Sequence, residues 1–149
     1  MTNLESIGGA LIVLFGIGHM AGDWLFQTQK MAENKTKDPV VRAKHCAIYT
    51  LCVGLLMLFW RGTPQAWNGQ WVTFGLLIAW LYFSHFIIDS YKPLFWYRKL
   101  TKDPYAQTIE QFKERFNTPA GFVVYVTLDQ VFHLFCLLPV ANVLVTLSA

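Results

Sequence analysis

Four long apolar blocks constrain this chain more than any other feature of its sequence. They cover residues 7–26, 40–60, 71–91 and 120–147. A helix that crosses the hydrocarbon core of a bilayer needs about 20 mostly apolar residues, and each block is long enough to supply them. Because these blocks account for most of the chain, the sequence predicts a polytopic membrane protein of the all-α class, with one four-helix bundle over residues 1–149.

The composition supports this fold class. Hydrophobic residues make up 54% of the chain and charged residues only 14%, whereas a soluble domain has about 25% charged residues. The first block has no basic region before it and no small-residue cleavage pattern after it, so we expect a retained helix rather than a signal peptide. The cysteines lie inside apolar blocks without CxxC spacing, which indicates packing rather than chemistry. They are Cys46, Cys52 and Cys136.

Two Pro-containing signals sharpen the predicted helix starts. Asp38 before Pro39 and Thr118 before Pro119 resemble an N-cap followed by a first-turn proline. The predicted helices therefore cover about 7–26, 39–60, 71–91 and 119–147. The last would be about 42 Å long against about 30 Å of hydrocarbon, so it must tilt, protrude or kink at Pro139.

Small residues and an amphipathic segment add two further expectations. Gly18 and Gly22 form a small-xxx-small pair, which favours close contact between the first helix and a neighbour. Apolar residues then recur at helical spacing within residues 104–116. This pattern predicts an amphipathic helix, placed either on the inner-leaflet surface or against the bundle as a lid.

The basic residues gather on the first and third connections. They are Lys30, Lys35, Lys37, Arg42 and Lys44 around the first, and Lys92, Arg98, Lys99, Lys102, Lys113 and Arg115 in the third. Only Arg61 borders the second connection. By the positive-inside rule, connections one and three are cytoplasmic and both chain ends lie outside. Membrane topology accounts for these charges, so we predict no binding of nucleic acid.

Histidine and aspartate dominate the ionisable residues inside the helices. Three pairs have i,i+4 spacing and therefore project from one face of a helix: His19 with Asp23, His85 with Asp89, and Asp129 with His133. The order is reversed in the fourth helix, as its opposite direction requires. The pairs should therefore meet near the cytoplasmic face, with the histidines deeper, the aspartates nearer the interface, and His45 of the second helix close by.

Three carboxylates at membrane depth need a compensating cation, because each costs about 2.5–3.5 kcal/mol to insert. Imidazole and carboxylate suit Zn²⁺ best, with Fe²⁺ or Mn²⁺ as alternatives. The predicted ligands are His19, Asp23, His45, His85, Asp89, Asp129 and His133. Seven ligands exceed one tetrahedral site, so one or two ions could bind, with other members acting as orienting groups. A metal-free proton relay and simple hydrogen bonding between helices remain alternatives.

Four neighbouring side chains are candidates for substrate binding. Lys92 follows Asp89 by three positions and Gln27 follows Asp23 by four, so each shares a predicted helix face with its aspartate. Gln130 and Lys35 are weaker candidates. For each of them, a solvated position at the membrane interface is the competing interpretation.

The motifs together resemble a family of bacterial and phage membrane proteins, domain of unknown function 3307. The residues that carry the resemblance are His19-Met-Ala-Gly-Asp23-Trp-Leu-Phe-Gln27, Met31-Ala-Glu-Asn-Lys35, His45, His85-Phe-Ile-Ile-Asp89 with Lys92, and Asp129-Gln130-Val-Phe-His133. The resemblance implies a multi-pass protein of the bacterial inner (cytoplasmic) membrane. The chain is also loosely similar to the YdjM-type membrane-bound metal-dependent hydrolases, from which it departs in motif order.

The leading functional hypothesis is a metal-dependent hydrolase that acts on a lipid or another amphipathic substrate near the cytoplasmic face. His45 and Asp129 are the candidate catalytic residues, with a non-ligating His or Asp acting as general base. Transfer of the hydrolase activity from the similar family is an analogy. Alternatives are a carrier or channel component for metal ions or protons, which would work as a homo-oligomer, or a membrane factor that binds a partner and has a structural metal.

Overall fold

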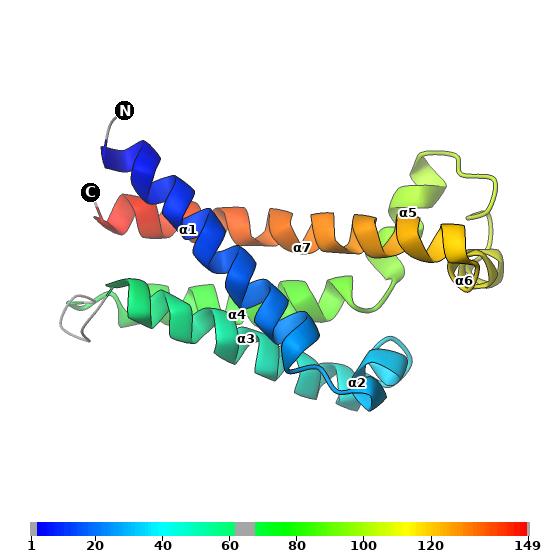
Figure 1. Ribbon diagram of the computed structural model, residues 1–149, viewed down its shortest axis with the longest axis horizontal. Coiled ribbons are helices and arrows are strands. Elements are labelled where there is room, and N and C mark those ends of the chain that lie inside the picture. Colours follow the sequence, from blue (N-terminus) through cyan, green and yellow to red (C-terminus); the bar gives the residue numbers. More distant parts are fainter. Residues whose placement is uncertain (1–2, 62–67, 149) are drawn as a thin grey trace.

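Four long helices form the body of the protein. The computed structural model describes residues 3–61 and 68–148, and in these ranges all regular structure is helical. The long helices are α1 (Asn3–Met20), α3 (Pro39–Arg61), α4 (Trp71–Ile88) and α7 (Pro119–Ser148), and they form an elongated bundle (Figure 1). Each contributes to a stretch long and apolar enough to cross a membrane: Gly8–Leu25, Pro39–Trp60, Trp71–Ile88 and Pro119–Leu147. The predicted all-α fold with four long apolar helices is confirmed.

Short helices lie together at one end of the bundle. A π-helical turn, η1 (Ala21–Leu25), continues α1, and α2 (Gln29–Asn34), α5 (Lys92–Leu100) and α6 (Ile109–Phe116) follow in the connections. Figure 1 shows α2, α5 and α6 at the end opposite the start of α1 and the end of α7. We call this the α2/α6 end. Both basic connections lie at this end, as the sequence predicts.

The helix starts follow their predicted caps. Asp38 Oδ1 accepts a hydrogen bond from the Val40 amide at 2.8 Å, and Thr118 Oγ1 accepts one from the Gly121 amide at 3.2 Å. These side chains satisfy amide groups that the first helical turn leaves without partners. At the other end of the bundle, α7 continues through Pro139 as one helix.

The connection after α4 differs from its prediction. The helix was expected to reach residue 91 but ends at Ile88, and Asp89 is its C-cap. Tyr91 then adopts φ 63°, a left-handed conformation that is uncommon for a residue with a side chain. This turn redirects the chain into α5, a helix that the sequence analysis did not predict. The amphipathic helix begins at Ile109 rather than 104, because Thr108 and Gln111 form a capping box there.

Helices α5 and α6 pack against the first half of α7. Their apolar side chains form a small cluster with that helix: Leu94, Phe95, Ala106, Phe112 and Tyr125. Of the two placements predicted for the amphipathic helix, the structure therefore has the one against the bundle. At about 1.5 Å per residue, the 30-residue α7 is about 45 Å long, and its first turns supply the surface on which α5 and α6 pack.

Helices α1 and α3 approach each other closely at two glycines. A Cβ atom at Gly22 would lie 2.8 Å from the Tyr49 Cα atom, and one at Gly18 would lie 2.7 Å from Leu56 Cδ1. The predicted small-xxx-small contact is confirmed, and its partner is α3. This contact fixes the height of η1, and therefore of Asp23, relative to α3.

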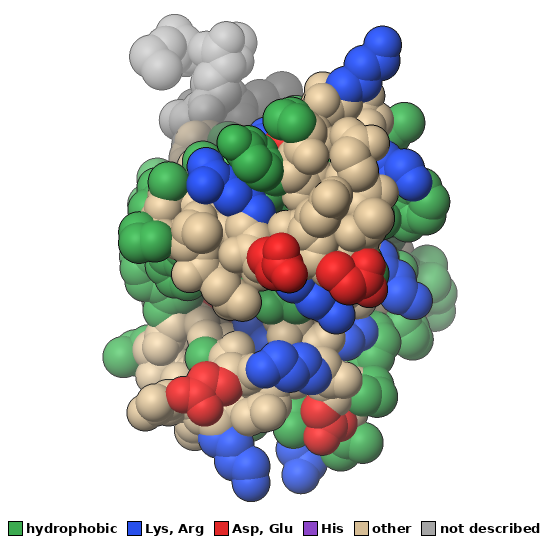
Figure 2. Space-filling model, turned by 90° about the vertical axis from the view of Figure 1, so that its right-hand side faces the viewer, with side chains coloured by type: hydrophobic (Ala, Val, Ile, Leu, Met, Phe, Trp, Pro, Cys, Tyr) green, Lys and Arg blue, Asp and Glu red, His purple; other side chains and the backbone are tan. Residues whose placement is uncertain are grey.

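Charged and apolar side chains are sorted along the bundle. Lys and Arg side chains gather on the face at the α2/α6 end, and no histidine side chain is visible there (Figure 2). In the opposite half, a core of aliphatic and aromatic side chains fills the bundle: Leu11, Phe15, Tyr49, Val53, Met57, Leu77, Leu81, Leu137, Val140, Ala141 and Leu144. The predicted charge asymmetry therefore runs along the long axis.

The contact at Gly22 leads to a stability prediction. Gly22→Ala should lower the unfolding free energy by about 1–3 kcal/mol, because the added methyl group meets the α3 backbone and the helices must separate. Gly16→Ala is the matched control, since a Cβ there has no atom within 4 Å. Thermal unfolding in detergent should show a lower melting temperature for Gly22→Ala alone. Equal melting temperatures would show that the close contact is not needed.

Candidate metal centre

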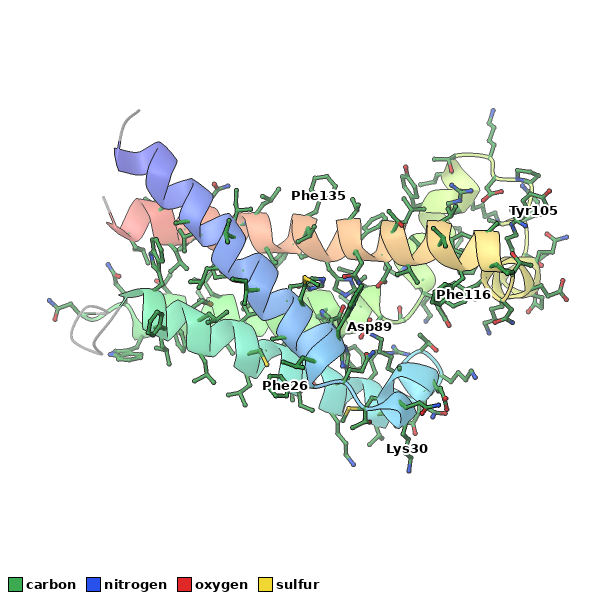
Figure 3. The ribbon with its side chains drawn as sticks, viewed as in Figure 1. Phe26, Lys30, Asp89, Tyr105, Phe116 and Phe135 are labelled. Carbon is green, nitrogen blue, oxygen red and sulfur yellow. The ribbon has the colours of Figure 1, made fainter. Side chains whose placement is uncertain are left out.

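The seven predicted ligands converge where η1, α3, α4 and α7 meet. His45 and His85 lie at the centre of the group, with their Nε2 atoms 3.1 Å apart. Asp23 reaches them from η1 and Asp89 from the end of α4, and all four side chains are buried. Figure 3 shows Asp89 between the helices, whereas Phe135 on α7 points away from the bundle. Residues far apart in sequence thus form one polar cluster.

Two carboxylate oxygens lie close to the Nε2 atoms of His45 and His85. His45 Nε2 lies 2.8 Å from Asp23 Oδ1 and 3.4 Å from Asp89 Oδ2. His85 Nε2 lies 3.3 Å and 3.4 Å from the same two oxygens. Ligand atoms around tetrahedral Zn²⁺, with bonds of about 2.0–2.1 Å, are about 3.3 Å apart. The donor atoms of His45, His85 and Asp89 are therefore spaced like one face of such a shell. Asp23 Oδ1 lies beside both nitrogens.

Protons alone do not satisfy the contacts of His45. Its Nε2 atom needs an N–H to donate to ionised Asp23 at 2.8 Å, but a lone pair to accept from the Lys35 ammonium at 3.1 Å. A neutral imidazole nitrogen offers one or the other, not both. A cation stabilises electron-rich atoms that lie this close together.

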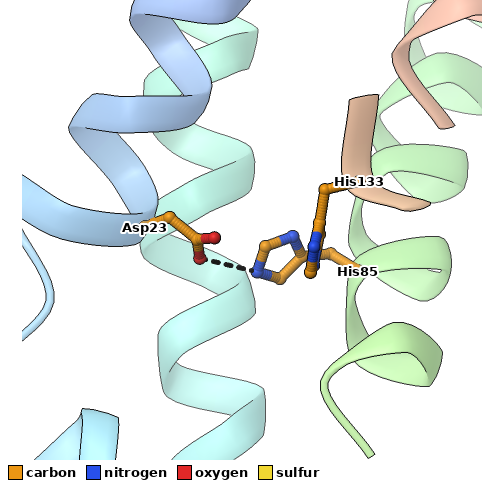
Figure 4. Close-up of side chains that lie close together, drawn as sticks. All are labelled: Asp23, His85 and His133. Atoms are coloured by element: carbon orange, nitrogen blue, oxygen red, sulfur yellow. Dashed lines mark ion pairs between the residues drawn. The ribbon is translucent and has the colours of Figure 1, made fainter. Parts of the chain in front are cut away.

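His133 is oriented as a further donor beside these residues. Its Nδ1 atom donates to the Asp129 carbonyl at 2.8 Å, so in the neutral ring the lone pair is on Nε2. That Nε2 atom is buried without a hydrogen-bond partner, as is Asp89 Oδ2. Figure 4 shows Asp23 facing the His85 ring, with His133 on the other side of that ring. Such fixing of one ring nitrogen is typical of metal-binding histidines.

The candidate ligands form three overlapping triads, each with donor atoms within 4.8 Å of one another. They are Asp23, His85 and His133; His45, His85 and Asp89; and Asp89, Asp129 and His133. The overlap gives the cluster room for one ion at its centre and a second beside α7.

His19 takes a different position from the other histidines. Its Nε2 atom lies 2.7 Å from Gln130 Oε1, which can only accept, so this nitrogen carries the proton. The Gln130 amide group in turn donates to Asp23 Oδ2 at 3.3 Å. His19 is absent from the three triads and is better placed to orient Asp23 through Gln130 than to bind an ion. Gln130, a weaker candidate in the sequence analysis, is thus part of the cluster.

Lys35 enters the cluster from the end of α2. Its Nζ atom lies 3.1 Å from Asp89 Oδ1 and 3.5 Å from Asp23 Oδ1. Burial alone would lower the pKa of Lys35, but Asp89 and Asp23 outweigh it, so the pKa lies above its usual value and the ammonium stays charged. From the sequence alone, Lys35 was only a weak candidate for substrate binding. The structure makes it a cation that neutralises the buried carboxylates.

Tyr49 is a member of the site that the sequence analysis missed. Its ring stacks on the His85 ring with centroids 3.8 Å apart, and it meets His19 edge-on at 5.6 Å. The side chain is only 2% exposed. Tyr49 therefore holds the plane of His85. The available signal was its position four residues after His45, which places it on the same face of α3.

The π-helical turn η1 is a second unpredicted feature. It lies where α1 ends, and it contains both Gly22 and Asp23. A π turn widens the helix and changes the direction of the side chains that follow, and such turns are frequent at functional sites. Simple i,i+4 geometry from His19 therefore does not describe how Asp23 reaches His45.

A cleft of about 520 Å³ opens beside the cluster. Its lining includes Asp23, Asp89 and Asp129 but none of the four histidines, which lie behind the carboxylates. The predicted two-layer order of histidines and aspartates is thus what the structure has. Gln27, Lys35 and Gln130 also line the cleft. Lys92 does not, because the turn at Tyr91 separates it from Asp89 and leaves it exposed.

The two predicted catalytic residues differ in access to this cleft. His45 is fully buried and does not line the cleft. Asp129 lines it, and its side chain is 26% exposed. Asp129 is therefore placed to meet a bound molecule, and His45 is placed to bind an ion.

The stack on His85 leads to a prediction for Tyr49. Tyr49→Ala should lower the unfolding free energy by about 3–5 kcal/mol, because it opens a cavity between His85 and Gly22. Tyr49→Phe keeps the ring and should stay close to wild type. Thermal unfolding of both variants in detergent measures the difference. Equal losses in the two variants would assign the contribution to the hydroxyl group rather than to the ring.

Comparison with known proteins adds a family to these observations. Neither a curated protein nor a solved structure matches the chain. A family model described as "Protein of unknown function (DUF3307)" matches residues 11–149, which include the whole cluster. The chain therefore belongs to the DUF3307 family.

Proposed function

We propose that the cluster binds a divalent metal ion and that the protein is a membrane-embedded, metal-dependent hydrolase of an amphipathic substrate. The observation that carries the proposal is the buried triad of His45, His85 and Asp89, whose donor atoms are spaced like one face of a tetrahedral shell beside a cleft lined by carboxylates. Asp23 Oδ1 lies next to both imidazole nitrogens of the triad. Zn²⁺ matches the mixed imidazole and carboxylate donors best. By the charge asymmetry, the α2/α6 end faces the cytoplasm of a bacterial inner membrane.

Four residues hold the ion in this proposal. They are Asp23, His45, His85 and Asp89, whose donor atoms already face one another. His133 and Asp129 lie beside these ligands as outer partners of the ion. A bound divalent metal supplies Lewis-acid polarisation of the scissile group and an activated water.

Asp129 is the proposed general base. Its carboxylate lies in the cleft, where it meets His133 Nδ1 at 3.5 Å and the Gln130 amide group at 3.4 Å. Both neighbours keep it oriented toward the cluster. Because it is half-buried beside the ligands rather than among them, it can accept a proton from a molecule in the cleft.

The lining of the cleft supports an amphipathic substrate. One part is polar, with the three aspartates, Lys35 and the two glutamines. The other part is apolar and comes from α4 to α7 and η1: Trp24, Ile88, Tyr91, Leu94, Phe116, Phe122 and Val126. A head group at the carboxylates and an acyl chain along the apolar wall would match both parts. A phospholipid or another lipid-linked ester or phosphodiester has this division.

A carrier function has less support. Beyond the cluster, apolar side chains fill the described core of the bundle. Tyr49 is the member of this core that stacks on His85. An ion or proton would find no further described ligands along that direction. The cleft is lined by residues of the short helices and the helix ends around them, and a cleft beside a closed apolar core suits an enzyme better than a transport path.

Metal content is the first test of the proposal. Wild-type protein purified with added zinc should contain at least one zinc ion per chain by elemental analysis, and His85→Ala should lose it because the central imidazole ligand disappears. His19→Ala is the matched control: it removes a buried histidine of the same cluster that is bonded to Gln130, and it should retain zinc. Folded wild-type protein without metal after supplementation would overturn the proposal.

Hydrolysis is the second test. Zinc-loaded protein should release water-soluble head groups from labelled bacterial lipids, and Asp129→Asn should slow the release by about 10²-fold or more while retaining the metal. Asp103→Asn is the control outside the cleft, since Asp103 pairs with Arg98. Full activity of Asp129→Asn would remove Asp129 from the base role. Bound metal without release from any lipid tested would reduce the proposal to a structural metal site.

A further inference from the structure

Helix α2 lies on the surface of the bundle against α3, and the residue that follows it reaches the cluster. None of its residues, Gln29–Asn34, is buried. Its C-cap, Lys35, instead extends a side chain that is 13% exposed into the cluster, where it meets Asp23, Asp89 and His45. The C-cap of a helix without buried residues therefore places a largely buried ammonium group in the site.

The backbone around Lys35 is held independently of its side chain. Arg42 on α3 donates from Nε to the Lys35 carbonyl at 2.8 Å and from Nη2 to the Thr36 carbonyl at 3.1 Å. The Lys35 side chain can therefore change its position by rotating about its own bonds while the chain between α2 and α3 stays in place. Lysine is suited to this, because its ammonium is carried on a flexible four-carbon stem.

The ammonium and a metal ion would share two atoms, Asp23 Oδ1 and His45 Nε2. Lys35 contacts one oxygen of Asp89, one oxygen of Asp23 and the Nε2 atom of His45, and each of these residues is among the proposed ligands. The lone pair of His45 Nε2 serves either an ammonium N–H or a metal ion. Two cations in this buried space would also repel each other strongly. Binding of one therefore opposes binding of the other.

The cleft offers the displaced ammonium other partners. Lys35 lines the cleft together with Gln27 and Asp129. Gln27 Oε1 is buried without a hydrogen-bond partner, and the Asp129 carboxylate is half-buried. An ammonium that left Asp23 and Asp89 would thus find acceptors in the lining of the same cleft.

We propose that Lys35 is an internal counter-ion that the metal must displace, and that it determines which cations the site accepts. This inference rests on the proposed metal centre. Lys35 keeps the carboxylates neutralised and in position, and its displacement lowers the affinity for every metal ion by the same factor. Only ions that imidazole and carboxylate bind tightly, such as Zn²⁺, then compete with it, whereas Mg²⁺, which imidazole binds poorly, does not.

Zinc titration against a competing chelator tests the exchange in purified full-length protein. Lys35→Met keeps the length of the side chain but removes its charge, and it should bind zinc at least tenfold more tightly than wild type. Lys37→Met is the matched control, because Lys37 is exposed two residues away, and it should equal wild type. Equal or weaker zinc affinity of Lys35→Met would overturn the inference. Zinc binding by neither wild type nor Lys35→Met would overturn the metal centre itself.

Lysine footprinting on wild-type protein keeps the test independent of whether Lys35→Met folds. Brief treatment with an acetylating reagent, read by mass spectrometry, should modify Lys37 equally with and without zinc. Lys35 should be protected without zinc and modified several-fold faster with saturating zinc, and Mg²⁺ should not reproduce the change. Unchanged protection of Lys35 in a sample that demonstrably contains zinc would overturn the exchange and leave the metal centre standing.

Discussion

Two buried carboxylates set the conditions that the rest of this site meets. Asp23 and Asp89 are each no more than 3% exposed in a bundle whose helices are otherwise apolar, and an unpaired charge in such surroundings is strongly unfavourable. Everything around them supplies positive charge or donors: the ammonium of Lys35, the rings of His45 and His85, and the amide of Gln130. The π turn, the close glycine contact and the stacked Tyr49 ring hold these partners at contact distance.

The fold was largely predictable because its main determinants are local. Apolar length determines a membrane helix, and Asp38 and Thr118 mark where two of them begin. The end of α4 was predicted three residues too late, because no local signal in the sequence announces the left-handed conformation of Tyr91 that redirects the chain. Helix α5 owes its position to apolar contacts with α7, which no local pattern contains.

Most members of the candidate site were predictable, with Tyr49 as an exception, but their roles were not. Spacing and reversed order along antiparallel helices were enough to bring the His–Asp pairs together. They could not separate His19 from the other histidines, because that depends on Gln130, 111 positions later in the chain. Likewise Lys35 looks like one more basic residue of a connection, and only the folding of α2 back over the bundle places it beside Asp89. The role of each residue depends on tertiary contacts, whereas helical periodicity was enough to predict that the His–Asp pairs belong to the site.

The apolar core beyond the histidines has a consequence for energy coupling. Since the described side chains from Leu11 to Leu144 in that core carry no charge, the proposed metal site would exchange ions through its cleft alone. A charge that enters and leaves by the same opening crosses none of the membrane potential, which supplies about 2.3 kcal/mol per elementary charge per 100 mV only to a charge that traverses it. Chemistry at this centre would run at the same rate in energised and de-energised membranes.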